Sequence, residues 1–503
     1  MNDSPGISGK TWFGHPRGLG TLFFTEMWER FSYYGMRALL VLFMTTETLD
    51  ANPGLGFGTA QAAAIYGLYT FFVYVLALPG GWIADNIWGQ RKAVFVGGCI
   101  IALGHFVMAG PMIGLPDEPA FFMGLFFIII GTGLLKPNVS TMVGDLYPEG
   151  GARRDAGFSI FYTGINLGAF LGPILTGIVG EGHNWHWGFS LAGVGMVLGL
   201  VQYRLGGRHL GEAGVLSIAQ SPAAVKRKER VTYAVTAGAL AVAAVLGWVL
   251  LSASLMALEL TQVAKIVGYA VIGVAVLYFA YLLAFTSHTR LEKRRLVVIF
   301  WLFILSAIFW SGFEQAGSSL NLFARDYTNR SIGGWLLPAS VLQSINSTFI
   351  ILLAPVFGAL WVYLARIQRN PSIPVKFGLG LLGLAAGFFV IAWGAANASV
   401  TNPVSPVWLV VMYFLHTVGE LCLSPVGLSS VTKLAPASRV GQMMGVWFIG
   451  TALGNLFAGL VAGSLEELEP SAVFGSVAMI IGAAGVVALV VFKPIKKLMG
   501  DVR

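Results

Sequence analysis

Four ionisable side chains interrupt an apolar stretch close to the N-terminus. The segment TEMWERFSYYGMR, residues 25–37, contains Glu26, Glu29, Arg30 and Arg37 within a run that is otherwise hydrophobic enough to cross a bilayer. At about 100° per residue, a helix places these four side chains within about a third of its circumference. Exposed to lipid, four charges would cost on the order of 10 kcal/mol. We therefore expect them to face a wet cavity and to neutralise one another, with Glu26 and Arg30 as an i,i+4 pair. The alternative is that they only hold helices together.

Three more charged residues lie in apolar segments further along the chain. Lys136 occurs in LLKPN, Glu314 in FWSGFEQAG and Glu420 in GELCLSP. Lys136 either extends its ammonium towards the membrane surface or is a counter-charge for the N-terminal acids. The first half of the chain thus offers positive charge and the second half negative charge. A cavity with a cationic and an anionic wall suits a small zwitterion, such as a molecule with one ammonium and one carboxylate.

The same charges suggest a proton-coupling mechanism. A carboxylate that loses its basic partner to a substrate carboxylate, in a poorly solvated site, binds a proton more readily. Uncharged polar and aromatic side chains near these charges could line substrate pockets, although core packing is the alternative for each aromatic. These residues are Tyr34, Tyr74, Asn166, Trp310, Asn346, Ser424 and Trp447.

The composition requires a membrane setting for these residues. The 503-residue chain is 56% hydrophobic and 11% charged, with a mean hydropathy of +0.76, and long apolar runs recur throughout, which predicts a polytopic helical membrane protein. The net charge of +8 comes from basic residues in the loops, which indicates membrane topology and not nucleic-acid binding. The two cysteines lie in apolar runs and indicate neither disulfides nor a metal site. No cofactor is expected. Fourteen spans are predicted, at residues 19–46, 57–84, 92–111, 119–143, 156–180, 186–204, 231–252, 263–286, 295–323, 335–365, 373–395, 404–432, 439–463 and 471–492.

The loops between these spans predict the orientation. Basic residues gather in every second connection and at the C-terminus, whereas the alternate loops are mostly acidic or neutral, with RDYTNR (325–330) as the exception. The positive-inside rule then places both termini in the cytoplasm. The N-terminus lacks the pattern of a signal peptide. This pattern predicts an integral membrane protein with a defined orientation.

An internal repeat divides the chain. Residues 131–148 match residues 419–436, with the prolines of both segments 288 positions apart, and FYTGINLG (161–168) matches WFIGTALG (447–454). Six helices in each half leave two, which read as an inserted hairpin, and parallel six-helix halves are the architecture of major facilitator transporters.

The repeat predicts an all-α membrane protein of the major facilitator fold with three parts. These are an N-terminal six-helix bundle (1–210), a linker with the inserted hairpin (211–292) and a C-terminal six-helix bundle (293–503). The segment GGWIADNIWGQRK (80–92), with Asp85 and Arg91, resembles the gating-loop motif of that superfamily, in which the Asp pairs with basic groups. The alternative is a generic basic turn.

Several motifs resemble the proton-dependent oligopeptide transporter (POT) family. TEMWERFSYYG resembles its ExxERFxYYG pattern and FYTGINLG its FYxxINxG signature, and LLKPN, FWSGFEQ, QSINSTF, GELCLSP and QMMGVWF are also similar. The resemblance covers essentially the whole chain. The inserted hairpin is usual in bacterial members of the family, so the resemblance implies a bacterial inner membrane.

This resemblance implies a role for each candidate residue. It implies a symporter that imports di- and tripeptides with protons, by alternating access at a central cavity. By motif position, Arg37 and Lys136 would bind the peptide carboxylate, and Glu420, Asn166 and Asn346 the amino terminus. Tyr34, Tyr74, Trp310, Ser424 and Trp447 would line the pockets. Glu26, Glu29, Arg30, Lys136 and Glu314 would couple to protons, with Glu314 also at a gate, and Asp85 and Arg91 would form the gating loop.

Other functions are less consistent with the sequence. The nearest alternative keeps the fold and transports nitrate or another small organic anion, but the ExxER motif and the acidic wall are both present. An enzyme is not expected because HExxH, GxSxG and P-loop motifs are missing, and a channel would lack the charge arrangement at the repeat interface. The partners expected are short peptides, protons and membrane lipid, and the working unit is expected to be a monomer.

Overall fold

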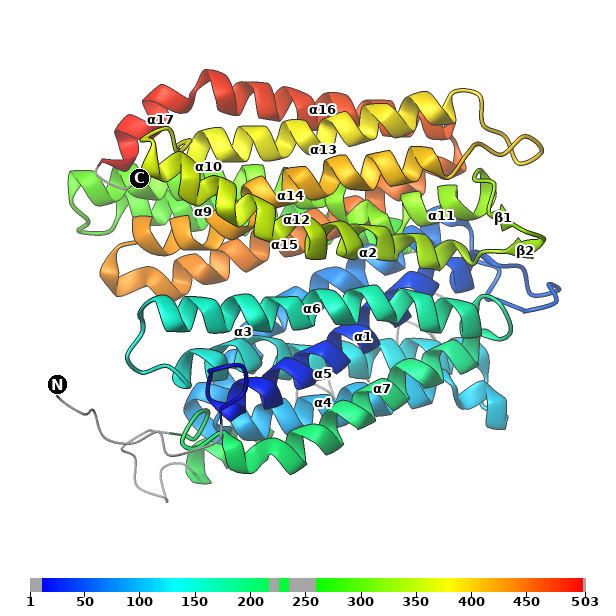
Figure 1. The fold of residues 1–503 in the computed structure, drawn as a ribbon, viewed down its shortest axis with the longest axis horizontal. Helices are drawn as coiled ribbons and strands as arrows, with labels where there is room; N and C mark the ends of the chain where they lie inside the picture. The colour runs from blue at the N-terminus through cyan, green and yellow to red at the C-terminus, as the bar shows by residue number, and fades with distance from the viewer. Residues whose placement is uncertain (1–10, 217–225, 235–258, 501–503) are drawn as a thin grey trace. The chain divides into compact units, whose positions relative to one another are not determined.

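A computed structural model describes residues 11–216, 226–234 and 259–500. Its regular structure is almost entirely helical (Figure 1). Within the described residues, twelve helices are long and apolar enough to cross a membrane. Helix α1 (Arg17–Thr45) is also long enough, but its central charges interrupt the apolar run. The predicted span 231–252 lies mostly outside the described residues. The fourteen predicted spans are consistent with this arrangement, and the all-α membrane fold is confirmed.

The chain divides into two compact units that differ from the sequence halves. Unit 1 comprises residues 1–34, 76–172 and 189–257, and unit 2 comprises residues 35–75, 173–188 and 258–503. Three long helices therefore begin in one unit and end in the other: α1, α6 (Gly151–Gly180) and α7 (Trp185–Gly206). The predicted three-part division at residues 210 and 293 stays a prediction.

Unit 1 is built around α4 and α5, which pack along one another. Its buried core joins apolar side chains of α1, α4, α5, α6 and α7, including Leu19, Leu135 and Met196. Besides its parts of α1, α6 and α7, its elements are α3 (Ala77–Ile83), the π-helical turn η1 (Ala84–Trp88), α4 (Gln90–Met108), η2 (Gly110–Ile113), α5 (Asp117–Asp145) and η3 (Gly207–His209).

Unit 2 packs α13 against α14 and α16, and α15 against α2 and α10. Its first elements are α2 (Thr59–Val75), α9 (Leu260–Ala284), α10 (Arg290–Phe313), η5 (Glu314–Gly317), α11 (Ser319–Asp326), β1 (Ser331–Ile332), β2 (Trp335–Leu336) and η6 (Ala339–Gln343). They are followed by α12 (Ser344–Arg366), α13 (Ile373–Ala395), α14 (Val407–Leu434), η7 (Ala437–Arg439), α15 (Val440–Gly463), η8 (Ser464–Glu466), α16 (Pro470–Val490) and α17 (Phe492–Met499).

Two predicted spans begin or continue differently in the structure. The span predicted at 295–323 is interrupted, because α10 ends at Phe313 and a 3₁₀ turn begins at Glu314. The span predicted at 335–365 began too early, because residues 331–336 form the antiparallel hairpin β1–β2. Gly333 and Gly334 make its two-residue turn with φ of +58° and +84°, which side chains with a Cβ rarely adopt.

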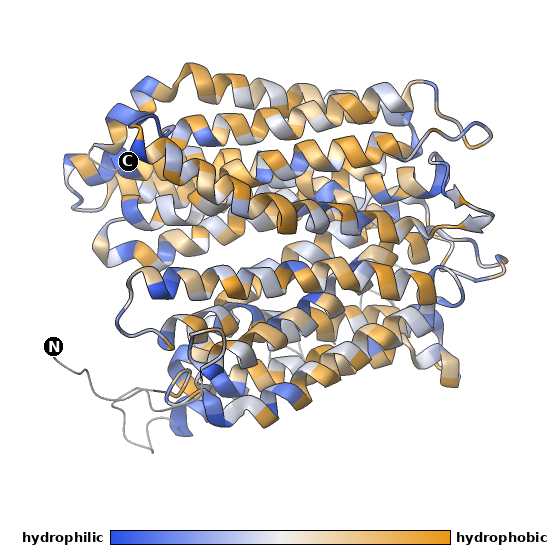
Figure 2. Cartoon of the chain, viewed as in Figure 1, coloured by the Kyte–Doolittle hydropathy of each residue, from blue (hydrophilic) through white to orange (hydrophobic). Residues whose placement is uncertain are grey.

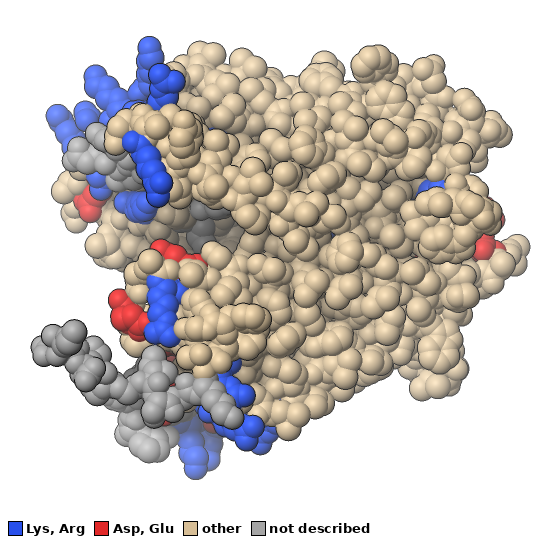
Figure 3. Space-filling view, in the orientation of Figure 1, with Lys and Arg blue, Asp and Glu red and all other residues tan. Residues whose placement is uncertain are grey.

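Polar and apolar residues separate along the helices as a bilayer requires. Figure 2 shows apolar residues along the helix bodies and hydrophilic residues at helix ends and loops. On the face of unit 2 seen in Figure 3, Lys and Arg side chains gather at the end that carries α17, and the long sides of the helices are largely uncharged. The two ends of the helices in unit 2 therefore differ in charge, as the loop pattern predicted.

Candidate functional site

The charged residues of the ExxER motif form a buried cluster in unit 1. Arg30 Nε lies 3.1 Å from Glu26 Oε1 and also contacts Glu29. All three side chains are at most 5% exposed. Lys136 acts electrostatically on the Glu26 carboxylate, and the Arg30 guanidinium lies 5.9 Å from the centre of the Tyr34 ring. The predicted i,i+4 pair is confirmed, and Lys136 belongs to the same group of charges.

A glycine of the FYTGINLG motif fixes the distance between α6 and this cluster. A Cβ on Gly168 would lie 2.2 Å from the Met27 carbonyl oxygen and 2.8 Å from Arg30 Cβ. Only glycine permits this approach of α6 to α1. On the preceding turn, Asn166 is buried and its amide donates to the Tyr162 carbonyl at 2.9 Å.

The remaining charge of α1 is paired within unit 2. Arg37 Nη1 lies 2.5 Å from Glu314 Oε2, and the two side chains are 8% and 6% exposed. The Tyr66 hydroxyl donates to the Glu314 carbonyl at 3.3 Å, at the point where α10 changes into η5. Two residues that the sequence placed in different roles, Arg37 at the substrate and Glu314 at a gate, are thus bonded to each other.

A second polar group in unit 2 lies between α12 and α14. The Asn346 amide donates to Thr417 Oγ1 at 3.0 Å and to Glu420 Oε2 at 3.4 Å. Glu420 is buried and Asn346 half-buried. The two residues that the resemblance implies for the peptide amino terminus are therefore neighbours.

The predicted pocket residues of unit 2 sit at close helix contacts. A Cβ on Gly454 of α15 would lie 2.5 Å from Trp310 Cβ and 2.8 Å from the Ala307 carbonyl oxygen. Trp447 is buried and its ring centre lies 6.2 Å from that of Phe377. Tyr74 and Ser424 are both half-buried.

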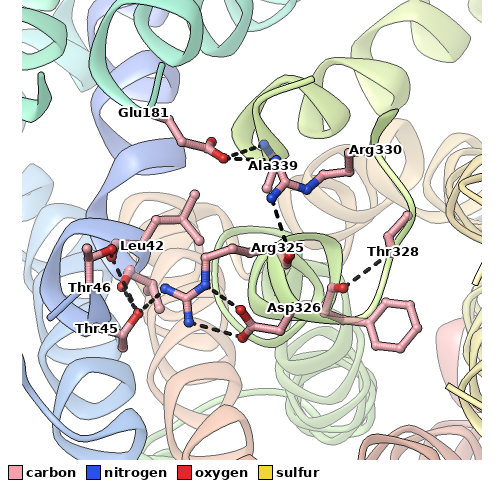
Figure 4. Close-up of polar contacts among 11 residues, drawn as sticks. Leu42, Thr45, Thr46, Glu181, Arg325, Asp326, Thr328, Arg330 and Ala339 are labelled. Atoms are coloured by element: carbon pink, nitrogen blue, oxygen red, sulfur yellow. Dashed lines mark hydrogen bonds and ion pairs between the residues drawn. The ribbon is translucent and has the colours of Figure 1, made fainter. Parts of the chain in front are cut away.

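The sequence did not identify a polar network at the hairpin end of unit 2 (Figure 4). Glu181 accepts hydrogen bonds from the backbone N–H groups of Ala339 at 2.7 Å and Ser340 at 3.0 Å. It also pairs with Arg330 Nη1 at 3.3 Å. Burial lowers the pKa of Arg330, and the Glu181 carboxylate opposes that shift.

A second arginine of the same loop is also neutralised. Arg325 pairs with Asp326 at 2.6 Å and donates to Thr45 Oγ1 at 2.7 Å, as Figure 4 shows. Both arginines of RDYTNR, the exception in the charge pattern of the loops, are therefore matched by carboxylates. That exception was the one available signal for the network.

The proposed gating loop differs in detail from its expected pairing. Asp85 is exposed and accepts a hydrogen bond from the Gln90 amide at 2.8 Å. Among the described residues it forms no ion pair. Arg91 Nε donates to the Ala213 carbonyl at 2.6 Å, and its guanidinium also contacts the Gly211 carbonyl. The Gln90 amide thus stands where a basic partner was expected. Among the described residues, no group of three or more His, Cys, Asp and Glu side chains could hold a metal ion.

Comparisons with known proteins agree with the sequence motifs. A family model described as "POT family" matches residues 91–479. The peptide transporter YePEPT of Yersinia enterocolitica is 43% identical, over 99% of this chain and 98% of its own length. A di-/tripeptide transporter of Lactococcus lactis is 38% identical, over 98% of both chains. A crystal structure of a mutant of peptide transporter POT in complex with alafosfalin matches with a TM-score of 0.86 and 41% identity, over 98% of this chain and 97% of that one.

Proposed function

The chain belongs to the POT family and is an integral membrane transporter of the peptide-transporting type, and we propose that it is a symporter that imports di- and tripeptides together with protons. The proposal includes alternating access to a central binding cavity. Two relatives named as peptide transporters, one of them specifically as a di-/tripeptide transporter, support the substrate class. Their similarity to this chain extends over nearly its whole length.

The proposed substrate contacts follow from the charges of each unit. We assign the peptide carboxylate to Arg37 and Lys136, because cationic side chains bind carboxylates. We assign the amino terminus to Glu420 with Asn346, and the hydrogen bond between these two supports their joint action. Asn166 is assigned to the same end of the peptide. Pocket walls are assigned to Tyr34, Tyr74, Trp310, Ser424 and Trp447.

The observation that carries the proton-coupling proposal is the buried cluster of unit 1. Glu26 and Glu29 share one guanidinium, that of Arg30, and are at most 5% exposed. If Lys136 turns towards a substrate, the single positive charge of Arg30 cannot neutralise both carboxylates. One of the two carboxylates then binds a proton more readily. Protonation and peptide binding would thus use the same set of ion pairs.

The Arg37–Glu314 pair supports a second exchange of this kind. Arg37 is bonded to Glu314 at 2.5 Å, so a peptide carboxylate that takes Arg37 must release the Glu314 carboxylate. A carboxylate that has lost its basic partner in a buried site binds a proton more readily. We therefore propose that Glu314 is both a gate residue and a proton acceptor.

A glutamine substitution at Glu29 tests the coupling proposal. We expect Glu29→Gln, in proteoliposomes, to keep counterflow exchange of labelled dialanine but to lose uphill accumulation driven by an inward proton gradient. The matched control is Glu118→Gln, which removes an exposed carboxylate of the same unit and should leave both activities intact. Unchanged accumulation by Glu29→Gln would remove this residue from the coupling role.

We propose that the protein works as a monomer in a bacterial inner membrane with both termini in the cytoplasm. The concentration of Lys and Arg at one end of unit 2 supports this orientation, and Asp85 and Arg91 would then belong to a gating loop on the cytoplasmic side.

A further inference from the structure

A basic cavity lies in unit 1, apart from the ExxER cluster and next to the proposed gating loop. It has a volume of about 460 Å³ and lies between the first turn of α4 and the last turn of α7. Both helices are apolar enough to span a membrane, so the cavity lies where two spans reach the membrane surface. Its charged lining consists of Arg91, Lys92, Arg204 and Arg208.

Most of this positive charge is not neutralised by protein carboxylates. Arg91 donates to backbone carbonyls, which are uncharged acceptors. Lys92 forms an ion pair with Glu229 at 3.3 Å, and a hydrogen bond from Tyr233, followed by that from Lys92, lowers the pKa of Glu229. In the part of the chain that the structure describes, neither Arg204 nor Arg208 has an ion-pair or hydrogen-bond partner. Among the described residues, the four cations thus share one carboxylate contact, that of Lys92 with Glu229.

The cavity is built into the fold. Arg91 is held by the loop after α7 through its bonds to the Gly211 and Ala213 carbonyls. The Tyr203 hydroxyl donates to the Arg91 carbonyl at 3.3 Å and so joins α7 to the start of α4. Arg91 is therefore positioned by bonds to uncharged groups, which leave its charge available to an anion.

Apolar stripes lead from this cavity along both helices. On α7, residues three, seven and ten positions before Arg204 fall within about 80° of it on the helix. The two helices pack directly together, because Gly98 of α4 faces Met196 and Leu200 of α7. The exposed side chains of the stripes are Phe95, Cys99, Leu103 and Phe106 on α4 and Val194, Val197, Val201 and Leu205 on α7.

We propose that this cavity binds the phosphate of an anionic phospholipid, with the acyl chains lying along the α4 and α7 stripes. The positive cavity matches an anionic headgroup, and basic pockets at the end of membrane helices recognise such headgroups. The exposed apolar stripes decide for a lipid over a free phosphate, because a soluble anion would not use them. The cavity shares Arg91 with the proposed gating loop, but it contains none of the residues assigned to the peptide or to protons.

Photo-crosslinking of the full-length protein in lipid nanodiscs tests this site. The probe is phosphatidylglycerol with a diazirine in its acyl chain, and the labelled residues are mapped by mass spectrometry. We expect labelling within residues 95–106 and 194–205. Arg204→Gln with Arg208→Gln should weaken the apparent affinity about 30-fold, at about a fivefold loss for each cation.

Three controls separate the possible results. Lys496→Gln with Lys497→Gln, which removes two exposed cations of α17, should leave the labelling of α4 and α7 unchanged. Arg204→Lys with Arg208→Lys should restore most of it, which excludes misfolding as the cause of a loss. Inorganic phosphate should not compete at millimolar concentration.

Each opposite result would overturn the proposal. Equal losses in the α17 variant would indicate unspecific attraction by surface charge. Displacement by inorganic phosphate would make the cavity a site for a soluble anion. Equal labelling by a phosphatidylcholine probe with the same acyl chain would show that the four cations recognise no anionic headgroup.

Discussion

At the scale of residues, Arg37 and Glu314 form a buried ion pair whose loss should destabilise the protein. Both side chains are at most 8% exposed and lie 2.5 Å apart. Removing one partner of a buried ion pair leaves the other charge without compensation, at about 3–5 kcal/mol. Removing both partners leaves no uncompensated charge, so it should cost less than the sum of the two single removals. Two independent polar residues would show no such difference.

A double-mutant cycle measures this coupling. We expect Arg37→Gln and Glu314→Gln each to lower the thermal midpoint of the purified protein, and the double variant to be no less stable than the worse single variant. Thermal unfolding in detergent provides the readout. Additive losses in the double variant would show that the two residues do not stabilise one another.

The acidic residue of α14 allows a test of peptide polarity. Glu420→Gln should weaken binding of a free-amine dipeptide about 10–100-fold, because a hydrogen bond to a charged group contributes about 1.5–3 kcal/mol. An N-acetylated dipeptide, which lacks the ammonium, should be affected much less. Competition for labelled dialanine uptake compares the two, with the exposed Glu467→Gln as control. Equal losses for both peptides would assign Glu420 a structural role.

Residue-level prediction succeeded where the membrane makes charge expensive. Glu26, Arg30 and Lys136 stood out because they interrupt apolar runs, and the structure brings them together. Glu181 lies in a loop after α6, where a carboxylate attracts no notice. Its partners are 149–159 positions away, and no local pattern encodes such a contact.

At the scale of elements, two related glycines set the spacing of helices in the two units. Gly168 brings α6 close to α1 at the ExxER cluster, and Gly454, its partner in the repeat, brings α15 close to α10 at Trp310. The sequence revealed these glycines only as markers of the repeat. Their packing role depends on the facing backbone, which the spacing of residues in one helix does not disclose.

An alanine at Gly168 should disrupt the ExxER cluster. The new Cβ would lie 2.2 Å from the Met27 carbonyl oxygen and 2.8 Å from the Phe31 nitrogen, and backbone atoms cannot rotate away. We expect a destabilisation of about 1–3 kcal/mol and at least a tenfold loss of proton-driven uptake, both measured on purified protein. Gly273→Ala on α9, which has nothing within 4 Å, should change neither. Wild-type uptake by Gly168→Ala would contradict the role of this contact.

Element boundaries were predicted well where apolar runs are long and poorly where they are broken by backbone geometry. The interruption at Glu314 and the second strand of the hairpin, Trp335–Leu336, were both included in predicted spans. Hydropathy alone does not separate an apolar helix from an apolar hairpin, because Ile332, Trp335 and Leu336 favour either setting.

At the scale of the whole molecule, hydropathy and the repeat predicted the fold class without any contact information. Fourteen spans followed from run length, and the six-helix repeat from paired motifs. The compact units of the structure do not coincide with these halves, because α1, α6 and α7 each belong partly to unit 1 and partly to unit 2. A sequence repeat assigns each contiguous stretch of the chain to one half. It therefore cannot predict that a single helix packs in one unit at its start and in the other at its end.

Uptake of labelled dialanine by wild-type protein in proteoliposomes, with and without an inward proton gradient, tests the central claim most directly. We expect accumulation above the external concentration only when the gradient is present, and only equilibration when a protonophore abolishes the gradient. Accumulation that is the same in both conditions would contradict proton coupling, and no uptake of dialanine in either would contradict the peptide substrate.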